Sequence, residues 1–249
     1  MKVAVAGGTG VVGRHVVEVA REHGHEAAVL SRSAGVDLRD ESAVAEAVRG
    51  ASVIVDAANA FTLSEKKATA FFTEATARLS RAGKDAGATH VVVLSIVGIE
   101  RVPYPYYRAK IAQERAARAG PLPVTIVRAT QFHEFAGQLL DRSTFGPLSV
   151  VPVMTVQPIA ARAVAQVLVE AAEQPASTET LEIGGPRREQ LVDMARATLE
   201  RRGRRAKVLA VRVPGGAGRA MRGGALLPGP GARLLGPTFS DWIRSPSGP

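Results

Sequence analysis

Short apolar runs recur along the chain, with amphipathic segments between them. Runs of strand length lie near residues 2–6, 26–31, 52–56, 90–95 and 123–128. They are continuous in Val, Ile and Ala, as expected for strands that helices cover on both faces of a sheet. Helical spacing marks the segments between them, including residues 64–83, which begin at Ser64, and residues 104–119. This alternation predicts an α/β fold with a Rossmann-like, doubly wound parallel sheet.

The regular alternation ends after Arg128. We predict a long loop with one short strand over residues 129–156, and irregular chain over residues 214–237, where Gly and Pro are frequent. Between them the pattern predicts helices at 159–172 and 189–201 and strands at 179–183 and 206–211. Thr238 and Asp241 resemble a helix capping box. We expect one domain over residues 1–249, with a small C-terminal elaboration.

The amino-acid composition excludes several classes of protein and of functional site. Of 249 residues, 46% are hydrophobic, which is enough for one substantial core. The absence of cysteine excludes disulfides, thiolate metal sites and a cysteine nucleophile. The first apolar run ends in glycines before it reaches the length of a signal-peptide core, and no later run approaches the about 18 apolar residues of a membrane span. We therefore expect a soluble, cytoplasmic protein with no membrane partner.

The net charge of +9 raises the question of nucleic-acid binding. The densest basic run, residues 201–205, lies where a predicted helix ends, and cations there favourably face the negative end of the helix dipole. Aromatic residues make up 4% of the chain and none is interleaved with this run. We therefore expect no nucleic-acid partner.

A glycine-rich turn follows the first predicted strand and opens the first predicted helix. In dinucleotide-binding proteins one glycine allows the tight turn, the next lets the backbone approach the pyrophosphate, and the last lets helix and strand pack closely. The amide groups at the start of the helix then bind phosphate. The alternative is an ordinary strand-to-helix turn. The residues of this predicted dinucleotide site are Gly7, Thr9, Gly10, Val11, Val12 and Gly13.

The end of the second strand indicates which dinucleotide binds. An acidic residue there would accept hydrogen bonds from the free ribose hydroxyl of NAD. The sequence instead has Ser31 and Arg32, so no carboxylate repels a 2′-phosphate and the guanidinium can pair with one. An ordinary surface arginine is the alternative. We predict a preference for NADP(H) over NAD(H).

Tyr106 and Lys110 are four residues apart and share a face of the helix predicted there. An ammonium near a phenol lowers the tyrosine pKa from about 10, which makes Tyr106 a candidate general acid. Tyr107 is a geometric alternative, and the simpler interpretation is a half-buried tyrosine beside a solvated lysine. Ser95 ends its strand at the carboxyl edge of the sheet, where ligands bind, and is predicted to hydrogen-bond a substrate carbonyl.

Together, the glycine turn, Ser31-Arg32, the segment at residues 95–98, and Tyr106 with Lys110 resemble the short-chain dehydrogenase/reductase superfamily. The resemblance is to its atypical NAD(P)H-binding branch, which includes NmrA-like proteins; it spans roughly residues 1–200 and extends to residues 238–243. It implies that the serine positions a carbonyl, the tyrosine passes a proton, and the lysine lowers the tyrosine pKa and binds the nicotinamide ribose. It also implies cofactor contacts by Asp37, Leu38, Ala57, Ala58 and Asn59.

The loop after the fifth strand, residues 129–135, is predicted to border the nicotinamide and the substrate, with residues 129–157 and 185–249 forming the substrate-binding part. Its mixed aromatic and polar character suits a partly apolar small molecule. His133 is predicted to be a second acid or base, or else a packed histidine. Ala129 and Gln131 are assigned to the cofactor, and the substrate-binding residues are Val97, Gln131, Phe132, His133 and Phe135.

The predicted function is an NADPH-dependent oxidoreductase that reduces a carbonyl or conjugated C=C of a small organic molecule, with Tyr106 as proton donor. One alternative is a regulator that senses NADP(H) without turnover. Another is an isomerase or dehydratase that retains its nucleotide. We expect a monomer or homodimer. His23 and His25 lie in an exposed turn without metal-ligand spacing to the other histidines, so no metal is predicted.

Overall fold

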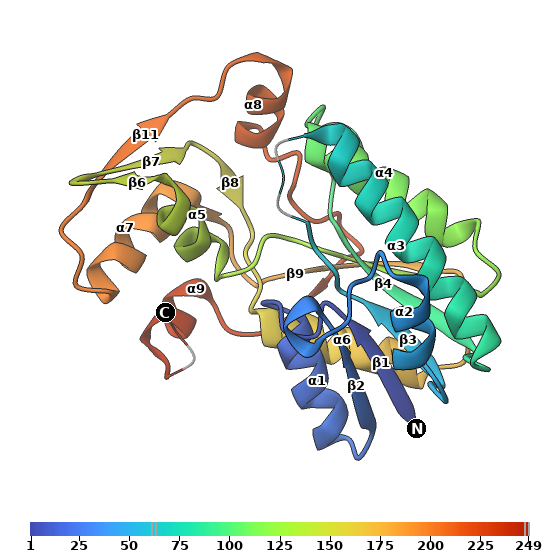
Figure 1. Cartoon of the computed structure of the whole chain (residues 1–249). Coiled ribbons are helices and arrows are strands. Elements are labelled where there is room, and N and C mark those ends of the chain that lie inside the picture. Colours follow the sequence, from blue (N-terminus) through green and yellow to red (C-terminus); the bar gives the residue numbers. More distant parts are fainter. Residues whose placement is uncertain (61, 63, 247, 249) are drawn as a thin grey trace. The chain divides into compact units, whose positions relative to one another are not determined.

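The computed structural model describes residues 1–60, 62, 64–246 and 248, and the chain divides into two compact units (Figure 1). Unit 1 contains Met1–Ser95, Tyr104–Arg128 and Val164–Leu181, and unit 2 contains Ile96–Pro103, Ala129–Ala163 and Glu182–Pro249. Both segments that are predicted to form the substrate-binding part belong to unit 2.

A parallel sheet forms the centre of unit 1. Its strands are β1 (Lys2–Ala6), β2 (Glu26–Leu30), β3 (Val53–Asp56), β4 (His90–Ile96), β5 (Val124–Ala129) and β9 (Thr180–Gly184). The full order is β12-β9-β5-β4-β3-β1-β2, where β12 (Arg233–Leu234) pairs with the end of β9 inside unit 2. Within unit 1, β1 pairs in parallel with both β2 and β3. The strand order therefore reverses between β1 and β3, which is where open α/β sheets bind ligands.

Helices cover both faces of this sheet (Figure 1). They are α1 (Gly13–Glu22), α2 (Glu41–Ala47), α3 (Glu65–Asp85), α4 (Pro105–Arg118) and α6 (Ala161–Glu173), with a short 3-10 helix η1 (Arg32–Ala34). Alternate strand residues point to opposite faces. Ala4 and Ile54 belong to the core beneath α2 and α3, while His90 on the other face hydrogen-bonds the carbonyl of Ala171 in α6.

Unit 2 combines small sheets with short helices. Its elements are η2 (Ile99–Arg101), α5 (Phe135–Ser143), β6 (Thr144–Phe145), β7 (Leu148–Pro152), β8 (Thr155–Val156), β10 (Glu189–Gln190), α7 (Leu191–Arg201), β11 (Lys207–Val211), α8 (Gly215–Arg222) and α9 (Phe239–Arg244). β11 pairs in parallel with β7, which pairs antiparallel with β6, and β10 pairs with β8. Helix α7 packs against both α5 and α9.

The α/β class, the doubly wound sheet and the predicted elements before Arg128 are confirmed to within a few residues. The long loop predicted over residues 129–156 is wrong, because that segment contains α5 and three strands. The strand β7 pairs with β11, far along the chain, and such long-range pairing leaves no local signal. Residues 214–237 also contain α8 and β12. Among the described residues, none of the helices has both the length and the hydropathy that crossing a membrane requires.

Candidate functional site

The glycine turn lies in unit 1 at the reversal point between β1 and β3. Gly7 has a φ of +73° and its amide donates to the carbonyl of Leu30 at 2.8 Å, while Gly10 donates back to Gly7 at 2.8 Å. A Cβ on Gly7 would lie 2.7 Å from the carbonyl oxygen of Ala57, and a Cβ on Gly13 would overlap the carbonyl of Gly7. The turn therefore requires glycine at both ends, because backbone occupies the space that a side chain would fill.

The start of α1 is left free of side-chain capping. Asp40, Ser64 and Thr238 each cap the helix that follows them, but Val12 precedes α1 without a side-chain cap and the first turn of α1 holds no acidic residue. The first amides of a helix need acceptors from outside the helix. At α1 the amides of Arg14 and Val16 already donate to the carbonyls of Gly10 and Val12, so a pyrophosphate would take the amides of the turn that precedes α1, with the positive end of the helix dipole behind them.

A hydrogen bond connects the glycine turn to the end of β2. Ser33 donates to the hydroxyl of Thr9 at 3.1 Å, and Ser31 caps η1 by accepting from the amide of Ala34. Arg32 is exposed at the start of η1, between these two serines. A side-chain hydrogen bond therefore joins the glycine turn to the segment that follows β2 within unit 1.

Asp37 and Leu38 follow on the same side of the sheet. The hydrogen-bonded guanidinium of Arg39 lowers the pKa of Asp37 to about 2, and Arg32 adds a smaller electrostatic lowering. Leu38 is buried in the core beneath α2 and α3 and its carbonyl accepts from Arg78. Asp37 is thus the more accessible of this predicted pair.

Tyr106, in the first turn of α4, donates its hydroxyl proton to Oδ1 of Asn59 at 2.9 Å. Asn59 follows β3, three residues beyond its end, so the structure brings together two side chains that the sequence analysis treated separately. Burial raises the pKa of Tyr106 to about 12, whereas the spacing to Lys110 predicts a lowered value. Burial also raises the pKa of Tyr107, the alternative candidate. Both phenols are held in the protonated form.

Lys110 explains why the expected lowering is not seen. Its ammonium donates to the carbonyl of Leu94 at 2.8 Å and to the side-chain oxygen of Gln113, and lies 4.9 Å from the centre of the Phe72 ring. The ring of Phe72 also contacts the ring of Tyr106 edge to face. Burial lowers the pKa of Lys110 to about 8, against the attraction of nearby carboxylates. Helical spacing puts Tyr106 and Lys110 on one face of α4, but the amine of Lys110 donates its hydrogen bonds to groups in the protein interior.

Ser95 is buried and donates its hydroxyl proton to Glu114 at 2.5 Å. Glu114 also binds Arg128 through both carboxylate oxygens, at 2.9 and 2.6 Å. The proton predicted to stabilise a substrate carbonyl is therefore directed to a carboxylate. A substrate role for Ser95 stays a prediction and requires its hydroxyl to leave Glu114.

The residues predicted to contact substrate lie in unit 2. Val97 donates its amide to the carbonyl of Ala129 at 3.0 Å, and Phe132 forms a bridge to Ile159. Phe135 begins α5, and Gln131 precedes that helix with a buried side-chain oxygen that has no partner among the described residues.

His133 is fully buried in unit 2. Its Nε2 donates to the carbonyl of Pro237 at 3.1 Å, and its ring packs against Phe239 and Trp242 with centroid distances of 5.6 and 5.2 Å. Burial lowers the pKa of His133 to about 4. His133 was interpreted either as a second acid or base or as a packed histidine. Its surroundings in the structure favour the packed histidine.

A family model described as NAD(P)H-binding matches residues 7–175, which include the glycine turn, Asn59, Tyr106 and Lys110. The chain belongs to this NAD(P)H-binding family. No curated protein matches the sequence.

Several solved structures share the fold of this chain. They include UDP-glucose 4-epimerase from Thermus thermophilus in complex with NAD (18% identity, TM-score 0.68, covering 95% of this chain and 91% of that one). They also include triphenylmethane reductase from Citrobacter sp. with NADP(H) (16%, 0.63, 98% and 96%) and a short-chain dehydrogenase/reductase superfamily protein from Agrobacterium tumefaciens with NAD (18%, 0.66, 86% and 86%). The predicted NAD(P)H-binding family and the predicted fold are therefore confirmed.

A buried carboxylate that was not predicted from the sequence supports the predicted nucleotide-binding residues. Asp56, at the end of β3, accepts from the amide of Ala58 at 3.1 Å, from Thr76 at 2.6 Å and from Gln113 at 3.0 Å. These bonds hold the segment that carries Asn59. A carboxylate at the end of an otherwise apolar strand was the available signal, because a buried charge requires such partners.

Arg14 is a second residue that the analysis missed. It is exposed in the first turn of α1, where a cation opposes the helix dipole. A bound phosphate at the same helix end would offset this repulsion. The signal was an arginine directly after the last glycine of the turn.

Proposed function

We propose that this protein is an NADPH-dependent reductase that acts on a carbonyl or a conjugated C=C of a small organic molecule. The observation that carries the proposal is the arrangement inside unit 1, where an uncapped helix start, Arg32 and the Tyr106–Asn59 pair surround the carboxyl ends of β1, β2 and β3. Membership of the NAD(P)H-binding family and the fold shared with a reductase that holds NADP(H) support it.

The residues present fit a dinucleotide. Backbone lies where side chains on Gly7 and Gly13 would project, so these glycines let the turn pack tightly, while the exposed Gly10 leaves a side of the turn that a phosphate can approach. Arg32 and Arg14 supply positive charge for a 2′-phosphate and a pyrophosphate. A charge-assisted hydrogen bond contributes about 1.5–3 kcal/mol, which corresponds to a preference of roughly 10- to 100-fold for NADPH over NADH. When bound, the reduced nicotinamide supplies the hydride.

Tyr106 supplies the proton. Its raised pKa keeps the phenol protonated at neutral pH, and its hydrogen bond to Asn59 holds the ring in place. With nucleotide and substrate bound, the phenol would leave Asn59 and pass its proton to the substrate atom on which negative charge develops. Ser95 is the predicted orienting group for that atom. Lys110, buried beneath Phe72, adds positive charge close to the site.

The test combines cofactor binding with turnover. Fluorescence titration with NADPH and NADH should give the tighter Kd for NADPH. A panel of aldehydes, ketones and enones, followed by loss of NADPH absorbance, should then reveal turnover. Tyr106→Phe should lower kcat by at least about 100-fold and leave the Kd for NADPH nearly unchanged. Tyr104→Phe is the matched control, because Tyr104 is exposed at the helix start and no role is assigned to it. Full activity of Tyr106→Phe would refute the assignment.

A second function is favoured by the same geometry. The proton of Tyr106 is bonded to Asn59 and that of Ser95 to Glu114, while the amine of Lys110 donates to Leu94 and Gln113. A protein whose candidate catalytic groups all donate to other side chains or to the backbone suits a sensor that binds NADP(H) without turnover. Tight NADPH binding with no consumption across the substrate panel would support the sensor and contradict the reductase.

A further inference from the structure

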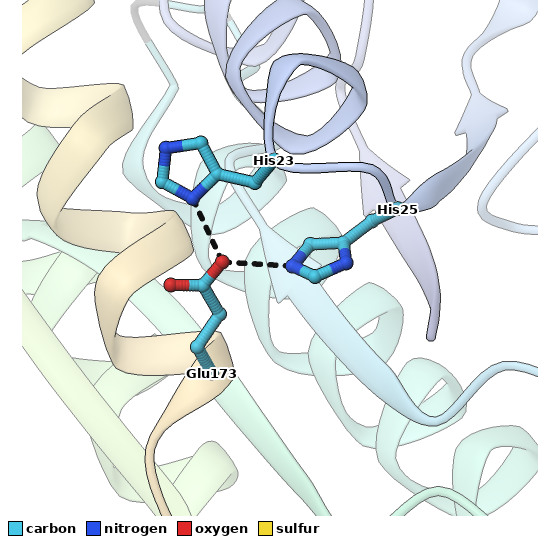
Figure 2. A group of neighbouring side chains, drawn as sticks. All are labelled: His23, His25 and Glu173. Carbon is cyan, nitrogen blue, oxygen red and sulfur yellow. Dashed lines mark hydrogen bonds and ion pairs between the residues drawn. The ribbon is translucent and has the colours of Figure 1, made fainter.

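Two histidines and a glutamate meet at one end of unit 1, away from the residues used above (Figure 2). His23 and His25 lie in the turn between α1 and β2, and Glu173 is the last residue of α6. Nδ1 of His23 and Nε2 of His25 each lie 2.8 Å from the same carboxylate oxygen of Glu173. One potential ligand atom from each residue lies within 4.8 Å of the others.

The backbone holds the two imidazoles in this arrangement. Gly24, between them, has a φ of +77°, and its amide donates to the carbonyl of Arg21 at 2.9 Å. The amide of His25 donates to the carbonyl of Ala20 at 2.9 Å. These bonds close the end of α1 and turn both histidine side chains to the same side, toward α6 (Figure 2).

We propose that His23, His25 and Glu173 bind a zinc ion, with water as the fourth ligand. Two imidazole nitrogens and a carboxylate oxygen are ligands that Zn²⁺ accepts in tetrahedral sites with an open position. With bonds of about 2.0–2.1 Å, tetrahedral ligand atoms lie about 3.4 Å apart. The two 2.8 Å nitrogen–oxygen separations would widen by about 0.6 Å, and the separation of the two nitrogens, which lies within 4.8 Å, would adjust toward the same value.

The exposure of the three side chains suits a site at the surface. Relative exposures of 41% for His23, 15% for His25 and 29% for Glu173 leave a path for the ion and room for water.

Helix dipoles add to the attraction for a cation. His23 caps the C-terminus of α1, and Glu173 is the C-terminal residue of α6. The C-terminal end of each helix carries partial negative charge, and here two such ends face one cluster. A zinc ion would connect the end of α1 to the end of α6, at the opposite end of α1 from the glycine turn. Zinc binding is therefore expected to raise the stability of the protein, and this effect does not depend on the proposed reductase activity.

The experiment titrates Zn²⁺ into metal-free, tag-free full-length protein in competition with a chromophoric chelator. We expect one equivalent to bind and the thermal midpoint of unfolding to rise. His23→Gln, His25→Gln and Glu173→Gln should each weaken binding by at least about tenfold. His15→Gln is the matched control, because His15 also contacts a glutamate, Glu18 at 2.7 Å, but without a second histidine in the pair.

Substitution of Co²⁺ for Zn²⁺ provides a second measurement on the unmodified protein. Tetrahedral cobalt absorbs strongly in the visible range, and an excess of Mg²⁺, which prefers oxygen ligands, should not displace it. Absence of stoichiometric Zn²⁺ binding would overturn the proposal, and the three residues would then form only a hydrogen-bonded cluster. Unchanged affinity in His25→Gln, or equal loss in His15→Gln, would also overturn it by showing that zinc binds elsewhere.

Discussion

Acid should destabilise the protein through His133, and the size of the effect follows from its surroundings. The ring is 0% exposed, Nε2 donates to Pro237, and Nδ1 has no partner among the residues that the structure describes. Protonation would place a charge and an unsatisfied N–H in the interior, and burial accordingly lowers the pKa of His133 to about 4 from an ordinary 6.5. Below about pH 6.5 His133 binds a proton in the unfolded chain, whereas in the folded chain it binds one only when the pH falls to about 4.

The pKa of His133 is lower in the folded chain than in the unfolded chain, so the neutral ring favours the folded state. The stability from neutral His133 is complete above the unfolded pKa and is lost as the pH falls toward the folded pKa. At about 1.4 kcal/mol per pKa unit, the total loss is about 3 kcal/mol, of which about 2 kcal/mol is lost between pH 8 and pH 5.

Chemical denaturation of the wild type and of His133→Gln at these two pH values measures the effect. Glutamine does not titrate and retains an N–H for the carbonyl of Pro237. Its lower stability from lost packing is independent of pH, so only the difference between the two pH values matters. The wild type should lose about 2 kcal/mol more than the variant on acidification. Equal losses in the two proteins would refute the reasoning, as would a pKa near 6.5 for His133 measured by NMR.

Three further predictions concern the nucleotide site and its support. Gly13→Ala should weaken NADPH binding at least about tenfold, because the added methyl group overlaps the carbonyl of Gly7 and shifts the phosphate-binding amides; unchanged affinity by titration would contradict this. Arg32→Asp should reverse the ratio of NADPH to NADH affinities, and an unchanged ratio would remove the proposed role. Glu114→Gln should cost about 2–3 kcal/mol in denaturant unfolding because the partly buried Arg128 loses the charge of the buried carboxylate to which it donates, while Glu65→Gln, in an exposed ion pair, should change stability little.

The fold of the first 128 residues could be predicted because its signals are local. Continuous apolar runs mark strands that are covered on both faces, and Ser64 marks the start of α3, where the structure shows it capping the helix. Unit 2 was predicted less well. Its β6 and β8 have two residues each, β7 pairs with β11 far along the chain, and α8 contains three glycines, which disfavour helix formation. Arg222, at the end of α8, donates to the carbonyl of Val213, a stabilising contact that no helix propensity reveals.

The candidate site, too, could be predicted only in part. The glycine turn was predictable because the steric constraint on each glycine comes from backbone a few residues away or from the neighbouring strand segment. The partners of Tyr106, Lys110 and Ser95 were not, because spacing along a helix defines a face but not where a long side chain ends. Asn59, Gln113 and Glu114 supply those partners.

The order of apolar and polar residues by itself determined the class of fold, the strand-turn-helix that suits a dinucleotide, and the absence of thiol chemistry. These properties depend on backbone geometry and composition, which act locally. Only the tertiary structure decided which buried groups satisfy one another: that Ser95 bonds to Glu114, that His133 packs as a neutral ring, and that Glu173 approaches His23 and His25 across about 150 residues of chain. Such contacts depend on how distant segments pack, and the energy of a buried proton or charge is set by those neighbours.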